Sequence, residues 1–436
     1  MQIKCLNDLQ EKAKQLDATD DLAHKLHEFE LPKQQIYLDG NSLGPLTKAA
    51  KARAKEVVEQ QWGADLIESW NKHKWIGLPK TIGNKIANLI GAEENTVVCA
   101  DSISVNLFKV LSAALLIQEQ GLKQETQQTP PIQNKRTIIL SQADNFPSDI
   151  YMAQGLSNLL GENRCKLHTV SSKDIEHELQ ENGDKIAVVM LTHVNFKNGD
   201  ISDMQAITQL AHQKGALIIW DLAHSAGVLP LELQHCEVDF AVGCTYKYLN
   251  GGPGAPAFVY VAKKLQKAIQ QPLSGWMGHK QAFAFLHDYE AADGPEQMLS
   301  GTPPILSMSI LDASLGAFEG INIHQIRHKS IALNGFFQEC VEHLMIDDLF
   351  ELACHPSANL RGSQISYTHP YAYAICQALI AHNVVPDFRA PNILRLGFSP
   401  LFLTYEQVFN AARILADLVN KQEYKNSMYQ QMKEVT

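Results

Sequence analysis

The 436-residue sequence contains no long uncharged apolar run and no excess of positive charge. No stretch approaches the roughly 18 apolar residues that a membrane helix needs. The first 15 residues, MQIKCLNDLQEKAKQ, lack the apolar core of a signal peptide. The net charge is -10, and Lys and Arg are scattered along the chain, which argues against a nucleic-acid partner. We therefore expect a cytoplasmic protein that binds neither membranes nor nucleic acid.

Clustered cysteines are also lacking, although the chain has eight. They are dispersed, with no C-x-x-C pair and no spacing typical of a zinc site, so we expect reduced thiols and no bound metal. Hydrophobic residues make up 45% of the chain and charged residues 19%, a balance typical of a compact globular protein. The length exceeds what a single core usually serves, which predicts a large domain and a smaller one.

Short apolar runs alternate with helical patterns through the middle of the sequence. Five runs look like buried strands, at residues 137–140, 166–170, 186–191, 216–220 and 238–242. This alternation predicts an α/β fold with a mostly parallel sheet flanked by helices. The run at 255–261 follows a Gly-Gly-Pro-Gly turn with no helix between, which predicts one antiparallel strand. Ligands of such sheets bind beyond the carboxyl ends of the strands.

The two ends of the chain differ from this pattern. Residues 1–35 resemble a helix, and beyond residue 310 long helices with a late apolar run at 392–397 indicate a second lobe. The Gln-, Thr- and Pro-rich segment 120–135 is interpreted as a surface loop. We expect an N-terminal helix and arm at 1–45 that packs on the small lobe and the active site, a large domain at 46–310 and a small domain at 311–436.

An acid and a lysine follow neighbouring apolar runs. Asp221 comes directly after the run 216–220, and Lys247 follows the run 238–242 and precedes the glycine-rich turn 251–254. Pyridoxal phosphate needs a lysine amine for a Schiff base and an acid that keeps its pyridine nitrogen protonated. Asp221 alone could be a helix N-cap. A solvated loop lysine at position 247, however, would leave the glycines and the aligned acid unexplained.

Two further segments fit the same cofactor. Ile103 and Ser104 lie where a strand meets a helix N-terminus, whose free N–H groups favour an anion such as the cofactor phosphate, although a plain serine cap explains them equally well. After the run 137–140 come Phe146, which could stack on the pyridine ring, a proline at a helix start and the carboxylate of Asp149.

Several motifs together resemble the kynureninase family, whose members are fold-type I pyridoxal-phosphate enzymes. The matching stretches span nearly the whole chain: Leu-Asp-Gly-Asn-Ser-Leu-Gly at 38–44, Phe-Pro-Ser-Asp at 146–149, Asp-Leu-Ala-His-Ser-Ala-Gly at 221–227, Tyr-Lys-Tyr-Leu-Asn-Gly-Gly-Pro-Gly at 246–254, Gly-Trp-Met-Gly-His at 275–279, Gly-Thr-Pro-Pro-Ile at 301–305 and Arg-Leu-Gly-Phe at 395–398. The resemblance implies a seven-stranded, mostly parallel sheet with a smaller α+β lobe.

The resemblance also implies roles for individual residues. Lys247 would carry the Schiff base, and Asp221, aided by Asp149 and His224, would pair with the pyridine nitrogen. The remaining cofactor-binding positions are Ile103, Ser104, Phe146, Pro147, Ser148, Thr192 and Tyr246, with Trp276 and Thr302 reaching in from the second subunit of a homodimer. Arg395 would hold the substrate α-carboxylate, with the arm around Asn41 and Ser42 closing over it.

The implied reaction is hydrolysis of L-kynurenine, or its 3-hydroxy form, to anthranilate or 3-hydroxyanthranilate and L-alanine. Lys247 would move the α-proton, water would add to the side-chain ketone, and Tyr246 is the candidate for a later proton delivery. The sequence leaves open the choice between the two substrates. It equally leaves open whether the reaction serves tryptophan degradation or NAD biosynthesis.

Three alternatives remain at this point. A cysteine desulfurase or selenocysteine lyase shares the fold but usually has histidine, not Tyr246, before the lysine. A metal-dependent hydrolase is suggested by the i, i+4 pair His324 and His328, which has no third ligand. A binding module without catalysis would have little need to retain Lys247, Asp221 and Arg395.

Overall fold

The computed structural model describes residues 2–125 and 136–433, and its centre is a seven-stranded sheet. The strand order is β2-β8-β7-β6-β5-β3-β4, and every neighbouring pair is parallel except the two pairs that contain β8. The predicted mostly parallel sheet with one antiparallel strand is confirmed. The bounds are β2 Val97–Cys99, β3 Ile138–Gln142, β4 Lys166–Val170, β5 Ile186–Thr192, β6 Leu217–Asp221, β7 Phe240–Gly243 and β8 Phe258–Val261.

Helices cover both faces of this sheet because its buried side chains alternate between two cores. Along β5, Val188 and Met190 belong to the core with α5 (Ile103–Glu125) and α6 (Pro147–Leu160). Val189 and Leu191 belong to the opposite core. That core also contains residues of α4 (Leu78–Leu89), α7 (Ile175–Asn182), α8 (Met204–Gln213) and α9 (Ile305–Ser314).

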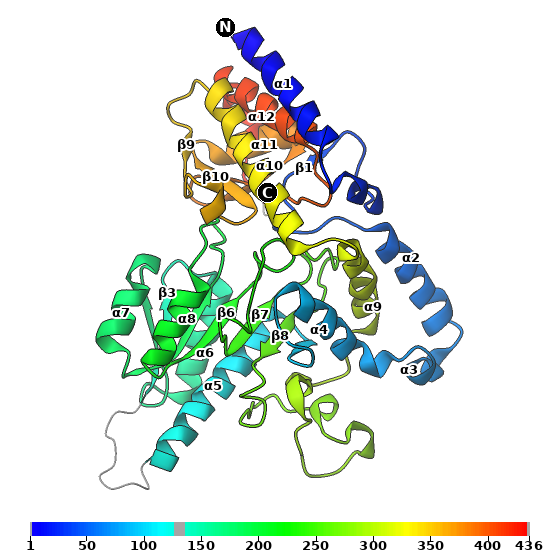
Figure 1. Cartoon of the computed structure of the whole chain (residues 1–436), viewed down its shortest axis with the longest axis vertical. Coiled ribbons are helices and arrows are strands. Elements are labelled where there is room, and N and C mark those ends of the chain that lie inside the picture. The colour runs from blue at the N-terminus through cyan, green and yellow to red at the C-terminus, as the bar shows by residue number, and fades with distance from the viewer. Residues whose placement is uncertain (1, 126–135, 434–436) are drawn as a thin grey trace.

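The C-terminal part has its own antiparallel sheet, in the order β12-β13-β10-β9. Figure 1 shows its helices, together with the N-terminal helix α1, above the large sheet. α1 packs against α12 and α10, and β1 pairs in parallel with β11. The bounds are α1 Gln2–Ala18, β1 Ile36–Tyr37, α10 Ile323–Leu344, β9 Glu351–Leu352, β10 Gln364–Thr368, α11 Ala372–Ala381, β11 Val384–Val385, β12 Asp387–Arg389, β13 Ile393–Gly397 and α12 Tyr405–Asn420.

Two expected segments differ from the structure. The N-terminal helix ends at Ala18 rather than near residue 35. Asp20 accepts a hydrogen bond from the backbone N–H of Leu22 (3.0 Å) and pairs with buried Lys329 (2.6 Å), and these contacts favour a turn there. In the second segment, α5 continues through Glu125, so the predicted loop 120–135 begins later, and residues 126–135 lie outside the described part.

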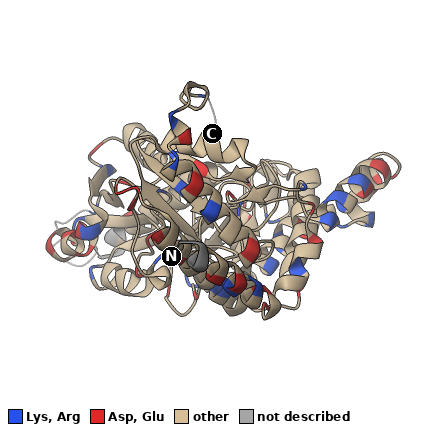
Figure 2. Ribbon diagram, turned by 90° about the horizontal axis from the view of Figure 1, so that it is seen from above, with Lys and Arg blue, Asp and Glu red and all other residues tan. Residues whose placement is uncertain are grey.

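Positions of Lys and Arg are interspersed with those of Asp and Glu along the ribbon, as Figure 2 shows. No helix among the described residues is long and apolar enough to cross a membrane. The domain boundaries predicted at 45/46 and 310/311 stay a prediction. The fold nevertheless places the arm after β1 against the C-terminal sheet, because Asp39 forms an isolated bridge with Gly397.

Candidate active site

The carboxyl ends of three neighbouring strands carry polar residues that come together. β5 ends at Thr192 and β6 at Asp221, and these two residues are direct partners in the parallel ladder. β7, the next strand, ends at Gly243, and the chain runs on through Cys244 to Lys247. The parallel sheet therefore brings residues 192, 221 and 247 to one edge, which strand-end reasoning predicted for Asp221 and Lys247.

A cavity of about 230 Å³ opens at this edge. Ten of the predicted site residues line it: Ile103, Ser104, Phe146, Ser148, Asp149, Thr192, Asp221, His224, Tyr246 and Lys247. Pro147 does not line it, but begins α6 between two residues that do. The sequence thus identified most of the wall of this cavity.

Two buried carboxylates lie in the cavity. Asp221 Oδ1 accepts a hydrogen bond from the backbone N–H of Ala223 (2.8 Å). No donor among the described residues reaches either buried oxygen of Asp149. Burial raises the pKa of Asp221, and burial together with the Asp221 charge raises the pKa of Asp149 well above its usual range. The two carboxyl groups interact with each other, and the Lys247 charge offsets part of the cost of burying them. The protonated ring nitrogen of pyridoxal phosphate would supply a cationic donor to this pair.

Lys247 lies opposite His224 in the same cavity. The two side-chain nitrogens, Nζ and Nε2, are 3.3 Å apart. Burial and the neighbouring Lys247 charge lower the pKa of the His224 imidazole well below its usual range. The imidazole is therefore neutral and adds no second positive charge beside the lysine amine.

Tyr246 places its ring next to the lysine. Lys247 Nζ lies 5.9 Å from the ring centroid. Burial, followed by the adjacent Cys244 thiol, raises the pKa of the Tyr246 hydroxyl, so that this group keeps its proton through the neutral range. Tyr246 is thus able to donate a proton or a hydrogen bond into the cavity.

The start of α5 forms an anion-binding wall. The helix begins at Ile103, and its first backbone N–H groups, including that of Ser104, have no partner within the helix. The preceding turn is fixed by Lys109, a fully buried side chain. Its amine donates to Asp101 Oδ2 (2.6 Å) and to the Met298 carbonyl (2.5 Å). This wall suits a phosphate group, and the two hydrogen bonds of Lys109 keep the turn before the helix in place.

An aromatic and a hydroxyl side form the rest of the cavity. The Phe146 ring is 39% exposed and meets Phe196 edge-on, with ring centroids 5.1 Å apart. Asn145 connects this ring to the strand ends: its Oδ1 accepts from the Phe146 N–H (2.7 Å) and from the Thr192 hydroxyl. Phe146 therefore offers a flat apolar surface at a fixed position, which suits a planar ring.

The three predicted substrate-binding residues lie beside the cavity rather than in its wall. The Arg395 guanidinium is 1% exposed and donates to the Phe196 carbonyl and, at 2.9 Å, to the Ser42 hydroxyl. Asn41 is fully buried, and its side-chain amide donates to Gln364 Oε1 (3.3 Å). Phe196 itself lines the cavity, so its hydrogen bond with Arg395 places the guanidinium next to the cavity wall.

Trp276 and Thr302 do not line the cavity of this single chain. Trp276 instead contacts the rings of Trp70, Phe283 and Phe285, with centroid distances between 5.5 and 6.5 Å. Thr302 is exposed. Their expected contact with the cofactor of a second subunit stays a prediction.

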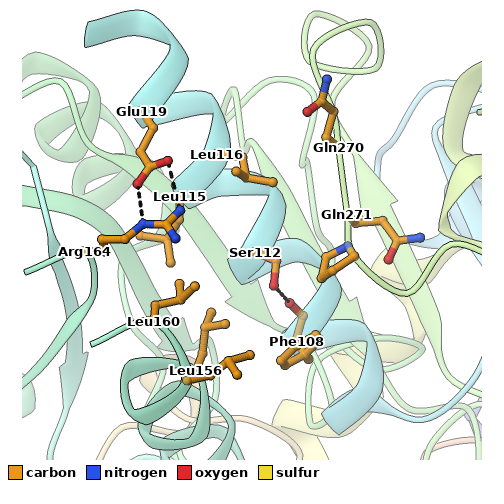
Figure 3. A pocket seen from close by; sticks show the side chains of 12 residues that line it. Phe108, Ser112, Leu115, Leu116, Glu119, Leu156, Leu160, Arg164, Gln270 and Gln271 are labelled. Carbon is orange, nitrogen blue, oxygen red and sulfur yellow. Dashed lines mark hydrogen bonds and ion pairs between the residues drawn. The ribbon is translucent and has the colours of Figure 1, made fainter. Parts of the chain in front are cut away.

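A second cavity and the histidine pair on α10 do not fit pyridoxal-phosphate or metal chemistry. A cavity of about 400 Å³ between α5, α6 and residues 270–272 has five leucines in its wall, together with the Glu119–Arg164 ion pair (Figure 3). It contains no lysine and no buried carboxylate pair. His324 and His328 are both exposed on α10, and no cluster of three or more metal-ligating side chains occurs within residues 2–125 and 136–433.

Some residues at the site escaped the sequence analysis. Phe196 lies four residues beyond the end of β5, and a wider search after each strand end would have found it. Asn145 immediately precedes a motif that was singled out, so its role was open to inference. Lys109 lies within α5, and Asp387 and Arg389 lie in β12, which follows no strand that the sequence analysis predicted. The local sequence gives no sign of their contacts.

A mostly parallel sheet with a lysine, two buried carboxylates and a helix start around one cavity defines an enzyme of the pyridoxal-phosphate type. Solved structures agree with this fold. An apo cysteine desulfurase from Thermococcus onnurineus NA1 aligns with a TM-score of 0.73, covering 92% of this chain and 98% of its own, at 19% identity. The cystine C-S lyase C-DES aligns with a TM-score of 0.71, covering 88% and 98%, at 17% identity. At these identities the likeness concerns the fold alone.

Proteins with similar sequences identify the family within this class of enzymes. A family model described as the kynureninase C-terminal domain matches residues 326–415. Kynureninase from Pseudomonas fluorescens is 44% identical over 97% of this chain and 98% of its own, and kynureninase from Burkholderia mallei is 43% identical over 95% and 96%. The chain belongs to the kynureninase family. Its cofactor is pyridoxal 5'-phosphate, which the buried carboxylates and Lys247 fit.

Proposed function

We propose that this enzyme hydrolyses L-kynurenine, and 3-hydroxykynurenine, to anthranilate or 3-hydroxyanthranilate and L-alanine. The observation that carries the proposal is the near-full-length relationship to kynureninases, joined to a cavity in which Lys247 lies beside two buried carboxylates. A cysteine desulfurase is less well supported, because the solved desulfurase shares only 19% identity and Tyr246 precedes the lysine.

The cofactor, when bound, supplies an aldehyde for covalent attachment and a protonated ring that withdraws electrons from the bond that breaks. Asp221 would hold the ring nitrogen in its protonated form, and Asp149 beside it would support the Asp221 carboxylate. The first N–H groups of α5 would hold the phosphate, and Phe146 would cover one face of the ring. These residues fix the cofactor before any substrate arrives.

Lys247 then moves a proton. Once the substrate amine has replaced it, the lysine amine is positioned to take the proton from the substrate α-carbon. The neutral His224, whose Nε2 lies 3.3 Å from the lysine Nζ, is placed to hydrogen-bond to the amine and orient it. Water adds to the side-chain ketone, and the bond from the ketone carbon to the β-carbon breaks. Tyr246, which retains its hydroxyl proton, delivers a proton in these later steps.

The proposal includes a homodimer with shared active sites. Apolar side chains are exposed in two segments, Trp62, Leu66 and Ile67 in the first and Phe283, Phe285 and Leu286 in the second. The segments meet where Trp70 contacts Phe283, at a centroid distance of 6.4 Å. Exposed apolar side chains gathered in this way are typical of a protein interface. Covering it with a second copy would bring that copy close to Trp276, the residue expected to reach across.

The cellular setting is also a proposal. Six of the cysteines that the structure describes, Cys99, Cys165, Cys236, Cys244, Cys354 and Cys376, are free thiols, which suits the reducing cytoplasm. Tryptophan degradation and NAD biosynthesis are the two settings proposed for this cleavage.

The test is an absorbance spectrum of the purified protein, followed by addition of L-kynurenine while anthranilate fluorescence is recorded. A visible band together with anthranilate release is expected. A visible band without anthranilate, but with sulfide release from cysteine, would contradict the proposed substrate and support the desulfurase alternative.

A further inference from the structure

A group of charged residues lies where the N-terminal arm meets the C-terminal sheet. We call it the arginine cluster; its members are Ser42 and Asp39 from the arm and Asp387, Arg389 and Arg395 from the sheet. Arg395 and Asp387 are direct partners across the antiparallel strands β13 and β12. Both are nearly fully buried, at 1% and 2% exposed. A buried guanidinium is costly without a countercharge, and Asp387 supplies it.

One oxygen of Asp387 organises the cluster. Asp387 Oδ2 accepts hydrogen bonds from Arg389 Nη2 (2.7 Å), from the Ser42 hydroxyl (2.9 Å) and from Arg395 Nη2. The Phe196 carbonyl accepts from the other terminal nitrogen of Arg395, Nη1. The guanidinium is therefore held at both ends and has little freedom to rotate.

One nitrogen of this guanidinium makes no hydrogen bond to the described residues. Arg395 Nε is buried and has no hydrogen-bond partner among the described residues, and the same is true of Arg389 Nε. Buried donors without partners are rare in proteins and often point to a ligand. The cluster adjoins the active-site cavity through Phe196, so an anionic group of the substrate could reach Arg395 there.

We propose that Asp387 is the positioning residue for Arg395: it fixes the guanidinium so that the enzyme selects substrates with a free α-carboxylate. This inference rests on the proposed role of Arg395 in binding that carboxylate. Arg389 and Arg395 donate to the same oxygen of Asp387. The positive charge of Arg389 therefore weakens the hold of Asp387 on Arg395, which leaves Arg395 able to bind the substrate carboxylate. Without the Asp387 charge, Arg395 would turn away and lose its preference for a carboxylate over a neutral amide.

The test compares L-alanine, a product carrying the carboxylate, with L-alaninamide, which lacks it. Each is titrated into the holoenzyme while the cofactor absorbance is followed, and the steady-state KM and kcat for L-kynurenine are measured in parallel. In Asp387→Asn the Kd for L-alanine and the KM should rise about tenfold, because an oriented, charge-assisted hydrogen bond is lost. The Kd for L-alaninamide and kcat should change less than about twofold.

The matched control is Asp348→Asn, an exposed aspartate in the same part of the chain, which should leave all four values unchanged. If Asp387→Asn does not fold, Arg389→Gln serves instead, because its side chain is 35% exposed. Since Arg389 restrains Asp387, the inference predicts that Arg389→Gln changes the L-alanine Kd while leaving the L-alaninamide Kd unchanged.

Three results would overturn the inference. Equal weakening of both ligands in Asp387→Asn would show a general structural role and contradict the inference alone. An unchanged L-alanine Kd in the folded variant would contradict it as well. Equal affinities for the two ligands in the unaltered enzyme would remove the role of Arg395 in carboxylate binding, and the inference with it. Hydrolysis of L-kynurenine is measured separately, so a failure of the proposed function is distinguishable from each of these.

Discussion

The two ends of the active site are built in different ways. The cofactor end collects residues from successive strand ends of one parallel sheet, and their order along the chain follows its architecture. The carboxylate end joins the arm at 39–42, the segment after β5 at Phe196 and the strands β12 and β13. The first end depends on the large sheet, whereas the second exists only when the arm and the C-terminal sheet pack together.

This difference predicts a division of labour. Changes at the cofactor end should act on kcat, because these residues move protons or hold the electron-withdrawing ring. Changes at the carboxylate end should act on KM, because those residues bind a part of the substrate that does not react. Four substitutions or pH changes can break or sharpen this division.

The largest effect is expected for Lys247→Ala. Loss of the amine removes both the covalent attachment of the cofactor and the base, so kcat should fall by about four orders of magnitude. The visible absorbance band should also disappear. Lys173→Ala, an exposed lysine outside the site, is the control. Substantial turnover in Lys247→Ala would contradict the assignment of the cofactor end.

Tyr246→Phe should come second. The variant keeps the ring beside Lys247 but loses the proton donor, so kcat should fall by about a hundredfold while KM changes little. Stopped-flow absorbance can separate the early proton removal, which should be preserved, from the later steps, which should slow. Turnover equal to that of the unaltered enzyme would exclude Tyr246 as the donor.

Arg395→Lys addresses the other end. Lysine keeps the charge but loses the planar pair of donors, so KM for L-kynurenine should rise about tenfold with kcat within about threefold. A fall in kcat with an unchanged KM would break the division between the two ends.

The smallest effect concerns pH. Burial and the neighbouring Asp387 charge raise the pKa of Asp39 to about 7. Asp39 is therefore neutral below that pH and ionised above it, and its negative charge then competes with the substrate carboxylate for Arg395. KM should rise about threefold between pH 6 and pH 8. In Asp39→Asn the same pH series should give a flat KM, and an unchanged slope would assign the titration to another group.

The sequence predicted the cofactor end because its signals are local. Buried parallel strands appear as apolar runs, and Asp221 and Lys247 follow two of them directly. The extent of the first helix was wrong, because Asp20 ends it through contacts that include the distant Lys329. The roles of Asp387 and Arg389 could not be predicted from the local sequence. They depend on contacts with Arg395 across the strand pair and with Ser42, which lies 345 positions before Asp387.

The central claim is that Lys247 binds the cofactor at the ends of β6 and β7. The most direct measurement is borohydride reduction of the holoenzyme, followed by peptide mass spectrometry to find the lysine that carries the pyridoxyl group. The account predicts modification of Lys247 and of no other lysine at stoichiometric level. Stoichiometric modification of a different lysine would contradict the assignment of this cavity as the active site.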